Sequence, residues 1–291
     1  MNSEKAVCQV CASADISAQF IVQGIQVKKC AQCGLVFVHP LPEEKELRAG
    51  YQQQYFQSAD PLSWGYENYL LMDKENRQTA ARRLHIVEEL IKSGSLLEIG
   101  CATGIFLQEA GKHGFQLTGI EISEFAGRIG REKYQVPIIT GTLPEAGLPE
   151  NNYDLVAMWD MLEHVPNPVA ELAAAAKVLK GGGYLFLTVP DTGTLAARLL
   201  GKKWFGFSKI REHLYYFNKK SIELALHKTG FEVLQIRSSP MLVSWGFLAG
   251  KLARYSKSLS RALAVFLKIF KLMDKTLNFK YIDMLVVARK I

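Results

Sequence analysis

The feature that most constrains the fold of this chain is an alternation of short apolar strands with helical stretches, which starts near residue 95 and continues almost to the last residue. Strands separated in this way by helices are typical of a doubly wound, mostly parallel sheet that is covered by helices on both faces. We therefore predict an α/β domain with a seven-stranded sheet over residues 95–291. The strands are expected at 96–100, 116–123, 136–141, 153–160, 182–191, 231–237 and 284–290.

A glycine-containing turn follows the first of these strands, in the stretch SLLEIGCATGIFL at 95–107. Ligands of doubly wound sheets bind at the carboxyl ends of the strands, so this turn is the expected binding loop. It lacks the Gly-Lys-Ser/Thr of a triphosphate loop and the GxGxxG of a dinucleotide loop. Instead, Glu98 precedes the turn and Glu121 closes the next strand, where an acceptor for a ribose diol is expected. Such carboxylates would repel a pyrophosphate, but they suit a ribose and an amino-acid end.

Five motifs occur in the order found in class I S-adenosylmethionine-dependent methyltransferases, and the chain resembles that family over about residues 66–240 and its last strand. The motifs are EIGCATG (98–104), GIEIS (119–123), YDLVAMWDMLEHVPNP (153–168), LKGGGYLFLTVPD (179–191) and HLYYFNKKSIELALHKTGFEVLQI (213–236). The resemblance implies a Rossmann-like fold with S-adenosylmethionine as cofactor. The cofactor-binding residues that it implies are Glu98, Gly100, Ala102, Gly104, Glu121, Ile122, Thr142, Leu143 and Asp160.

Two of these positions depart from the family pattern. Ala102 stands at the middle glycine of the first motif. Thr142 stands where the family often has an aspartate that reads the adenine amino group, so backbone groups are expected to hold adenine instead.

Candidate catalytic residues follow from where the strand ends would face the methyl group. Methyl transfer depends mainly on positioning, and a base is needed only when the acceptor must lose a proton. The candidates are Asp160, His164 and His213. Two other interpretations stay open, since Glu163 could serve a helix dipole and His164 could line the pocket without moving protons.

Four of the five cysteines form two CxxC pairs, Cys8 with Cys11 and Cys30 with Cys33, separated by 18 residues. This spacing is typical of a structural zinc site with four thiolate ligands and no open position for catalysis. Two disulfides or a redox motif are the alternatives, and both fit less well. We predict a zinc ribbon over residues 1–42, a helical lead-in over 43–94 with helices near 43–56 and 66–92, and then the α/β domain.

The net charge of +7 is concentrated in one segment, because residues 241–280 carry eight Lys or Arg and one Asp. Placed on one helical wheel, residues 251–275 show a basic side opposite an apolar side. The pattern predicts a basic amphipathic helical insert. It fits a helix in an anionic membrane interface. A helix packed on the core or on a partner, with solvated lysines, shows the same pattern and is favoured over the membrane interpretation.

The acceptor is open between classes. The ribbon and the REH at 211–213 resemble zinc-ribbon methyltransferases of sugar and polysaccharide biosynthesis, but Ile210 replaces the tyrosine that the C-methylating members carry. The stretch WDMLEHVPNP (159–168) resembles quinone O-methyltransferases, which work at a membrane surface. We expect O-methylation of a sugar, glycan or lipid-linked small molecule.

An RNA methyltransferase and a non-catalytic scaffold are the remaining alternatives, and a nucleic-acid partner is disfavoured because the ribbon has few basic residues. The sequence shows no secretory signal and no apolar run long enough to span a bilayer, so a cytoplasmic location is expected. Contact with the inner face of the membrane through 251–275 is the location that the membrane interpretation of the basic segment would add. The oligomeric state is not predicted.

Overall fold

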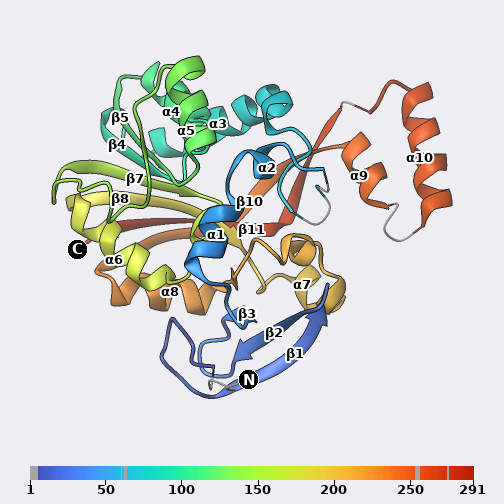
Figure 1. Ribbon diagram of the computed structural model, residues 1–291, viewed down its shortest axis with the longest axis horizontal. Helices are drawn as coiled ribbons and strands as arrows, with labels where there is room; N and C mark the ends of the chain where they lie inside the picture. Colours follow the sequence, from blue (N-terminus) through green and yellow to red (C-terminus); the bar gives the residue numbers. More distant parts are fainter. Residues whose placement is uncertain (1–5, 60, 62–63, 253–255, 274) are drawn as a thin grey trace.

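The computed structural model describes residues 6–59, 61, 64–252, 256–273 and 275–291 of the 291-residue chain. One seven-stranded sheet runs through the larger part of the molecule, with α3, α4 and α5 on one side and α6 and α8 on the other (Figure 1). These helices are α3 (Asp73–Glu88), α4 (Ile105–Gly111), α5 (Glu124–Ile129), α6 (Pro168–Val178) and α8 (Lys219–Lys228). The predicted doubly wound α/β fold is confirmed.

The strand order of this sheet is β10-β11-β8-β7-β4-β5-β6. The pairs from β8 to β6 are parallel, whereas β11 runs antiparallel to both β8 and β10. The strands are β4 (Gly94–Ile99), β5 (Phe115–Glu121), β6 (Ile138–Thr140), β7 (Tyr153–Trp159), β8 (Leu179–Pro190), β10 (Phe231–Ser244) and β11 (Thr276–Lys290). The order reverses between β4 and β7, and a ligand site is expected at that edge.

The central strands read as nearly continuous apolar runs because both of their faces are covered. In β7 the five residues Leu155 to Trp159 are all buried, and Leu96 and Leu97 of β4 are fully buried. Burial on both faces thus fixes this part of the sheet, while the polar residues are left to the strand ends.

A second sheet of four strands, in the order β1-β2-β3-β9, joins the N-terminal segment to the α/β body. Its strands are β1 (Ile16–Val22), β2 (Ile25–Cys30), β3 (Val36–His39) and β9 (Tyr215–Tyr216). The pairing of Val36 with Tyr216 and of Phe37 with Tyr215 brings residues far apart in sequence into one sheet. The N-terminal segment therefore shares a sheet with the α/β body rather than forming a separate domain.

The lead-in differs from expectation at its start. The helix expected near 43–56 is interrupted, since α1 (Glu44–Gly50) and α2 (Gln53–Phe56) are separated at Tyr51. The ring of Tyr51 packs against Tyr55 and Trp64, with centroids 4.8 and 5.6 Å away. This aromatic packing favours the break over a continuous helix. A short 3-10 turn (Tyr69–Met72) then leads into α3.

The basic insert also differs from expectation. The single helix assumed over 251–275 is wrong, because α9 (Trp245–Leu252) and α10 (Lys257–Ile269) are two separate helices. Lys271 has a φ of 52°, which ends the helical path after α10. The outer parts of the 241–280 segment are strand, belonging to β10 and β11. Within the described residues, no helix is long and apolar enough to cross a bilayer.

Candidate active site

A cavity of about 650 Å³ opens where the carboxyl ends of β4, β5 and β7 meet. This is the edge at which doubly wound sheets bind their ligands. Most of the predicted site residues line it, namely Glu98, Gly100, Ala102, Glu121, Ile122, Thr142, Leu143, Asp160 and His164. Gly104 and His213 are outside the described lining.

The glycine turn after β4 needs its glycines for space. Gly100 has a φ of 72°, and a Cβ there would lie 2.5 Å from Cγ of Met161. Gly104 has a φ of 75°, and a Cβ would lie 2.5 Å from Cγ2 of Val136. Left-handed backbone of this kind favours glycine. Gly104 is the N-cap residue of α4, and its missing side chain leaves room for Val136 and Ile138. Gly104 therefore contributes to the site by placing the turn.

Glu121 and Glu98 are both buried beside this turn, but their hydrogen bonding differs. Glu121 accepts hydrogen bonds from the backbone N–H groups of Ala102 and Ser123, at 2.8 and 2.9 Å. Oε2 of Glu98 has no hydrogen-bond partner in the described part of the chain. Burial raises the pKa of both carboxyls, that of Glu98 strongly.

A buried acceptor with an unmet hydrogen bond is costly unless a ligand supplies a donor. The residues present therefore fit S-adenosylmethionine, which brings an ammonium and a ribose diol to this turn. This fit rests on two observations: Oε2 of Glu98 lacks a hydrogen-bond partner among the described residues, and the carboxylate of Glu121 lines the same cavity.

Asp160 follows β7 and is held by two neighbours. Its carboxylate pairs with the guanidinium of Arg83, and the hydroxyl of Thr188 donates to its Oδ1 at 2.6 Å. The same guanidinium lies over the ring of Trp159, 4.9 Å from its centroid. Asp160 is thus oriented at the cavity wall with its charge neutralised by Arg83.

His164 is, with Asp160, one of two predicted catalytic residues that line the cavity. Its Nδ1 is 2.8 Å from the hydroxyl of Tyr51, and Nε2 is 4.0 Å from Oε1 of Glu163. Burial lowers the pKa of His164 to about 4, so the ring is neutral near pH 7. The ring of His213 packs edge-on to it at 4.7 Å. Burial also holds the pKa of His213 well below its usual range.

The lead-in contributes residues that the sequence analysis did not single out. Tyr51, Tyr55, Tyr66 and Tyr69 line the cavity and contact one another edge to face. The density of aromatic residues between 51 and 69 was the available signal, but only the tertiary structure brings them over the strand ends.

Glu212 of the REH motif holds this aromatic cap in place. Its carboxylate accepts from the Tyr55 hydroxyl at 2.9 Å and from the backbone N–H of Gly65 at 2.8 Å. The ammonium of Lys209 donates to the same carboxylate at 3.1 Å and lies 4.2 Å from the centroid of the Tyr66 ring. Glu212 is therefore a buried clamp between the lead-in and the body.

Two further acidic residues belong to the cavity wall. Asp283 and Glu171 line it, and burial raises their pKa values to about 8 and about 7. Asp160 adds to the effect on Asp283. Ser239, which pairs with Asp283 across β10 and β11, lies beside them. Carboxyl groups with raised pKa values can both donate hydrogen bonds to hydroxyl groups and accept them.

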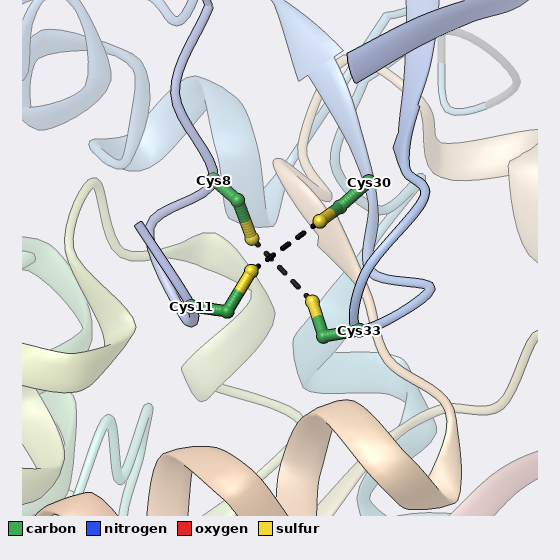
Figure 2. Close-up of side chains that lie close together, drawn as sticks. All are labelled: Cys8, Cys11, Cys30 and Cys33. Atoms are coloured by element: carbon green, nitrogen blue, oxygen red, sulfur yellow. Dashed lines mark hydrogen bonds between the residues drawn. The ribbon is translucent and has the colours of Figure 1, made fainter. Parts of the chain in front are cut away.

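The four cysteines predicted as metal ligands converge at the base of the N-terminal sheet (Figure 2). The Sγ atoms of Cys8 and Cys33 are 3.5 Å apart, those of Cys11 and Cys30 are 3.4 Å apart, and all four lie within 4.8 Å of one another. All are free thiols. Tetrahedral zinc with Zn–S bonds of about 2.3 Å needs sulfur atoms about 3.8 Å apart, so this donor set fits zinc.

Each CxxC pair sits in a tight turn of the same form. The backbone N–H of Ala12 donates to the carbonyl of Cys8 at 2.9 Å, and that of Gly34 donates to the carbonyl of Cys30 at 2.9 Å. Ala12 and Gly34 both have positive φ, 62° and 76°. The two turns are thereby shaped to present both sulfur atoms to one point.

The chain matches the family model described as "Methyltransferase domain" over residues 72–236, more than half of its length. Curated relatives named ubiquinone biosynthesis O-methyltransferase are similar over shorter segments. The protein of Hydrogenovibrio crunogenus is 34% identical over 105 residues, which are 34% of this chain and 43% of the relative. That of Shewanella halifaxensis is 32% identical over 118 residues, 36% of this chain and 49% of the relative. The chain thus spans less than half the length of these relatives.

Solved structures share the fold at low sequence identity. Magnesium protoporphyrin IX methyltransferase from Synechocystis PCC 6803, with bound SAH, superposes with a TM-score of 0.56 at 18% identity, covering 86% of this chain and 100% of that one. A SAM-dependent methyltransferase from Archaeoglobus fulgidus gives a TM-score of 0.51 at 19% identity, covering 76% of this chain and 99% of that one. From the family match, the strand order and these superpositions, the chain belongs to the methyltransferase domain family and has the Rossmann-like fold of class I S-adenosylmethionine-dependent methyltransferases.

Proposed function

We propose that this protein transfers a methyl group from S-adenosylmethionine to a hydroxyl oxygen of a small molecule. The observation that carries the proposal is that one cavity holds both the buried carboxylates of the glycine turn and the neutral ring of His164. When bound, S-adenosylmethionine supplies an electrophilic methyl group. The names of the curated relatives support an oxygen acceptor.

On the cofactor side, we assign Glu121 to the ribose hydroxyls and Glu98 to the aminoacyl ammonium. Gly100 and Ala102 let the backbone approach, and the backbone of Thr142 and Leu143 lies at the same cavity for adenine. Gly104 shapes the turn, and Asp160 with Ile122 completes the lining.

On the acceptor side, His164 accepts the hydroxyl proton as the methyl group is transferred. In the tautomer that allows this, Nδ1–H donates to the Tyr51 oxygen, which leaves Nε2 unprotonated and able to accept a proton. A depressed pKa keeps the ring neutral, which is the form a base needs. His213 supports His164 by ring packing, and the arginine-neutralised Asp160 orients the wall.

The acidic and aromatic lining favours an uncharged, hydroxyl-bearing acceptor. With their raised pKa values, Asp283 and Glu171 can exchange hydrogen bonds with hydroxyl groups, and Asp160 is paired with Arg83. A sugar, a glycan or the hydroxyl of a lipid-linked small molecule therefore fits this wall. A quinone or isoprenoid O-methyltransferase is the second candidate, supported by the curated relatives. For lipid-linked acceptors we also propose peripheral contact with the inner face of the membrane through residues 251–275.

We also propose that Cys8, Cys11, Cys30 and Cys33 hold one structural Zn²⁺. Four thiolates fill its coordination sphere, so this metal would stabilise the N-terminal sheet and take no part in methyl transfer.

The test has two stages. Titration calorimetry with S-adenosylhomocysteine is expected to show binding, and a labelled-methyl screen over glycans and quinones is expected to yield a methyl ether. The His164→Ala variant should keep cofactor binding and lose most turnover, on the order of 100-fold or more. Tight cofactor binding with no acceptor found in the screen would instead favour a non-catalytic scaffold.

A further inference from the structure

The helix α10 exposes an unusual amount of apolar surface. The side chains of Leu259, Val265, Phe266, Ile269 and Phe270 are each between 51% and 70% exposed. They lie on or just after a helix of 13 residues. Figure 1 shows α9 and α10 extending away from the body beyond the ends of β10 and β11. Burial against the core, one of the two explanations open from the sequence, accounts for only part of the apolar face.

The contacts divide α10 into three faces. The first packs on α9, where Ser260 and Leu267 are buried and the Ser260 hydroxyl donates to the Ala249 carbonyl at 2.7 Å. At 100° per residue, the second face is a basic strip about 40° wide, and the third spans about 140° and holds the exposed apolar side chains. The basic strip consists of Lys257, Arg261 and Lys268.

The charge of the segment decides what covers this third face. Residues 256–273 carry no acidic side chain, and Lys271 extends the positive charge past the end of α10. A second copy of this helix would bring like charges together. An anionic bilayer offers phosphates to the strip and an acyl layer to the apolar face.

We propose that α10 docks on an anionic lipid surface, with Leu259, Phe266 and Ile269 inserted and the basic strip against the headgroups. This deepens the proposed function by naming the inserting residues and the lipid charge, and it rests on the proposed membrane contact. The docked segment is connected to the cavity, because Ser239 and Asp283 in the β10–β11 ribbon that carries it both line the cavity. A lipid-linked acceptor would then reach the site from the surface on which the protein lies.

The experiment is co-sedimentation of the full-length protein with vesicles of phosphatidylcholine alone, or with phosphatidylglycerol added as the anionic lipid. Binding is expected only with the anionic lipid, and it should fall with added salt. The F266S/I269S variant is expected to bind at least about tenfold more weakly. The K257Q/R261Q/K268Q variant should lose on the order of fivefold per charge removed at low ionic strength.

Matched controls remove an exposed leucine and an exposed lysine elsewhere. Leu90→Ser and Lys92→Gln, both near the end of α3, should bind vesicles like the wild type. Equal binding of wild type and F266S/I269S to anionic vesicles would overturn the proposal. A second outcome would also overturn it: the wild type is a dimer by analytical ultracentrifugation, the F266S/I269S variant is a monomer, and neither protein binds vesicles. Calorimetry with S-adenosylhomocysteine on the same samples separates this outcome from a failure of the methyltransferase proposal.

Discussion

At the scale of single residues, the two buried carboxyl groups beside the glycine turn have different roles. Glu121 is satisfied by two backbone N–H groups and so fixes the turn, while Glu98 keeps one buried oxygen unmatched. An unmatched buried acceptor costs about 1–3 kcal/mol, which ligand binding would recover. The loop is therefore organised before the ligand arrives.

Replacing Glu121 with Gln tests the assignment to the ribose. The amide keeps the shape but weakens acceptance from the N–H of Ala102 and from a diol, so affinity for S-adenosylhomocysteine should fall roughly 10- to 100-fold. Calorimetry measures the change, and the exposed Glu132→Gln is the control. An unchanged affinity would show that the ribose lies elsewhere.

The depressed pKa of His164 predicts a pH dependence of stability. Its folded value of about 4 lies below the ordinary 6.5, so the unfolded chain binds more protons between these values. The contribution of His164 to the free energy of unfolding is fully present above about pH 6.5 and is lost as the pH falls towards 4. The total loss is up to about 3 kcal/mol. Buried Glu98 and Glu163, whose pKa values are raised, act with the opposite sign.

The difference between variants isolates this effect. Urea unfolding from pH 7.5 to 4.5 should show a smaller loss of unfolding free energy for His164→Asn than for the wild type. The exposed His85→Asn should follow the wild type. Parallel curves for all three proteins would contradict a neutral, buried His164.

At the scale of elements, the lead-in is held over the strand ends by one buried carboxylate. Glu212 receives the Tyr55 hydroxyl, the N–H of Gly65 and the ammonium of Lys209. Hydrogen bonds to a charged group contribute more than neutral ones, and the two from Tyr55 and Gly65 join segments more than 140 residues apart in sequence. The aromatic cap thus depends on tertiary contacts more than on helix propensity.

The Glu212→Ala variant should loosen this cap. It leaves buried donors unpaired, so we expect a loss of about 3 kcal/mol in unfolding free energy and faster proteolysis within residues 44–66. Limited trypsin digestion and denaturant unfolding measure both effects. Glu145→Ala, which removes an exposed ion pair with Arg48, should change stability by less than about 1 kcal/mol. Equal effects would indicate that Glu212 is not a clamp.

At the scale of the whole molecule, the cysteine segment and the α/β body behave as one unit. β3 pairs with β9, the residues just after His213, and the side chains of Lys228 and Lys220 donate to the carbonyls of Val10 and Gln32 at 2.7 and 2.6 Å. Asn218 also donates to the carbonyl of Cys33, at 3.3 Å. Order at the two cysteine turns is thereby linked to order near the site.

Removing the proposed zinc ion should therefore destabilise the α/β body as well as the N-terminal sheet. Chelation, or the Cys33→Ser variant, is expected to lower the melting temperature and to increase hydrogen exchange at residues 213–217. Metal content by elemental analysis should fall from about one zinc per chain, while Cys101→Ala, outside the cluster, keeps it. Wild-type protein purified without any bound zinc, or unchanged exchange after chelation, would contradict this link.

Much of this fold could be predicted because the pattern of apolar residues along the chain indicates which segments are buried. All seven expected strands are confirmed, since runs such as 155–159 are apolar and buried on both faces of the sheet. The helix boundaries were less predictable. The break at Tyr51 coincides with ring packing against Trp64, a contact that a helical wheel does not contain.

The sequence by itself determined the sheet, the glycine turn with its two carboxylates and the spacing of the four cysteines, because each rests on residues close together in the chain. Only the tertiary structure decided the rest. It placed the tyrosines of the lead-in over the strand ends, made Glu212 a clamp, and left one face of α10 exposed. These features depend on which distant surfaces meet, and the free energy of that packing is not encoded in any local pattern.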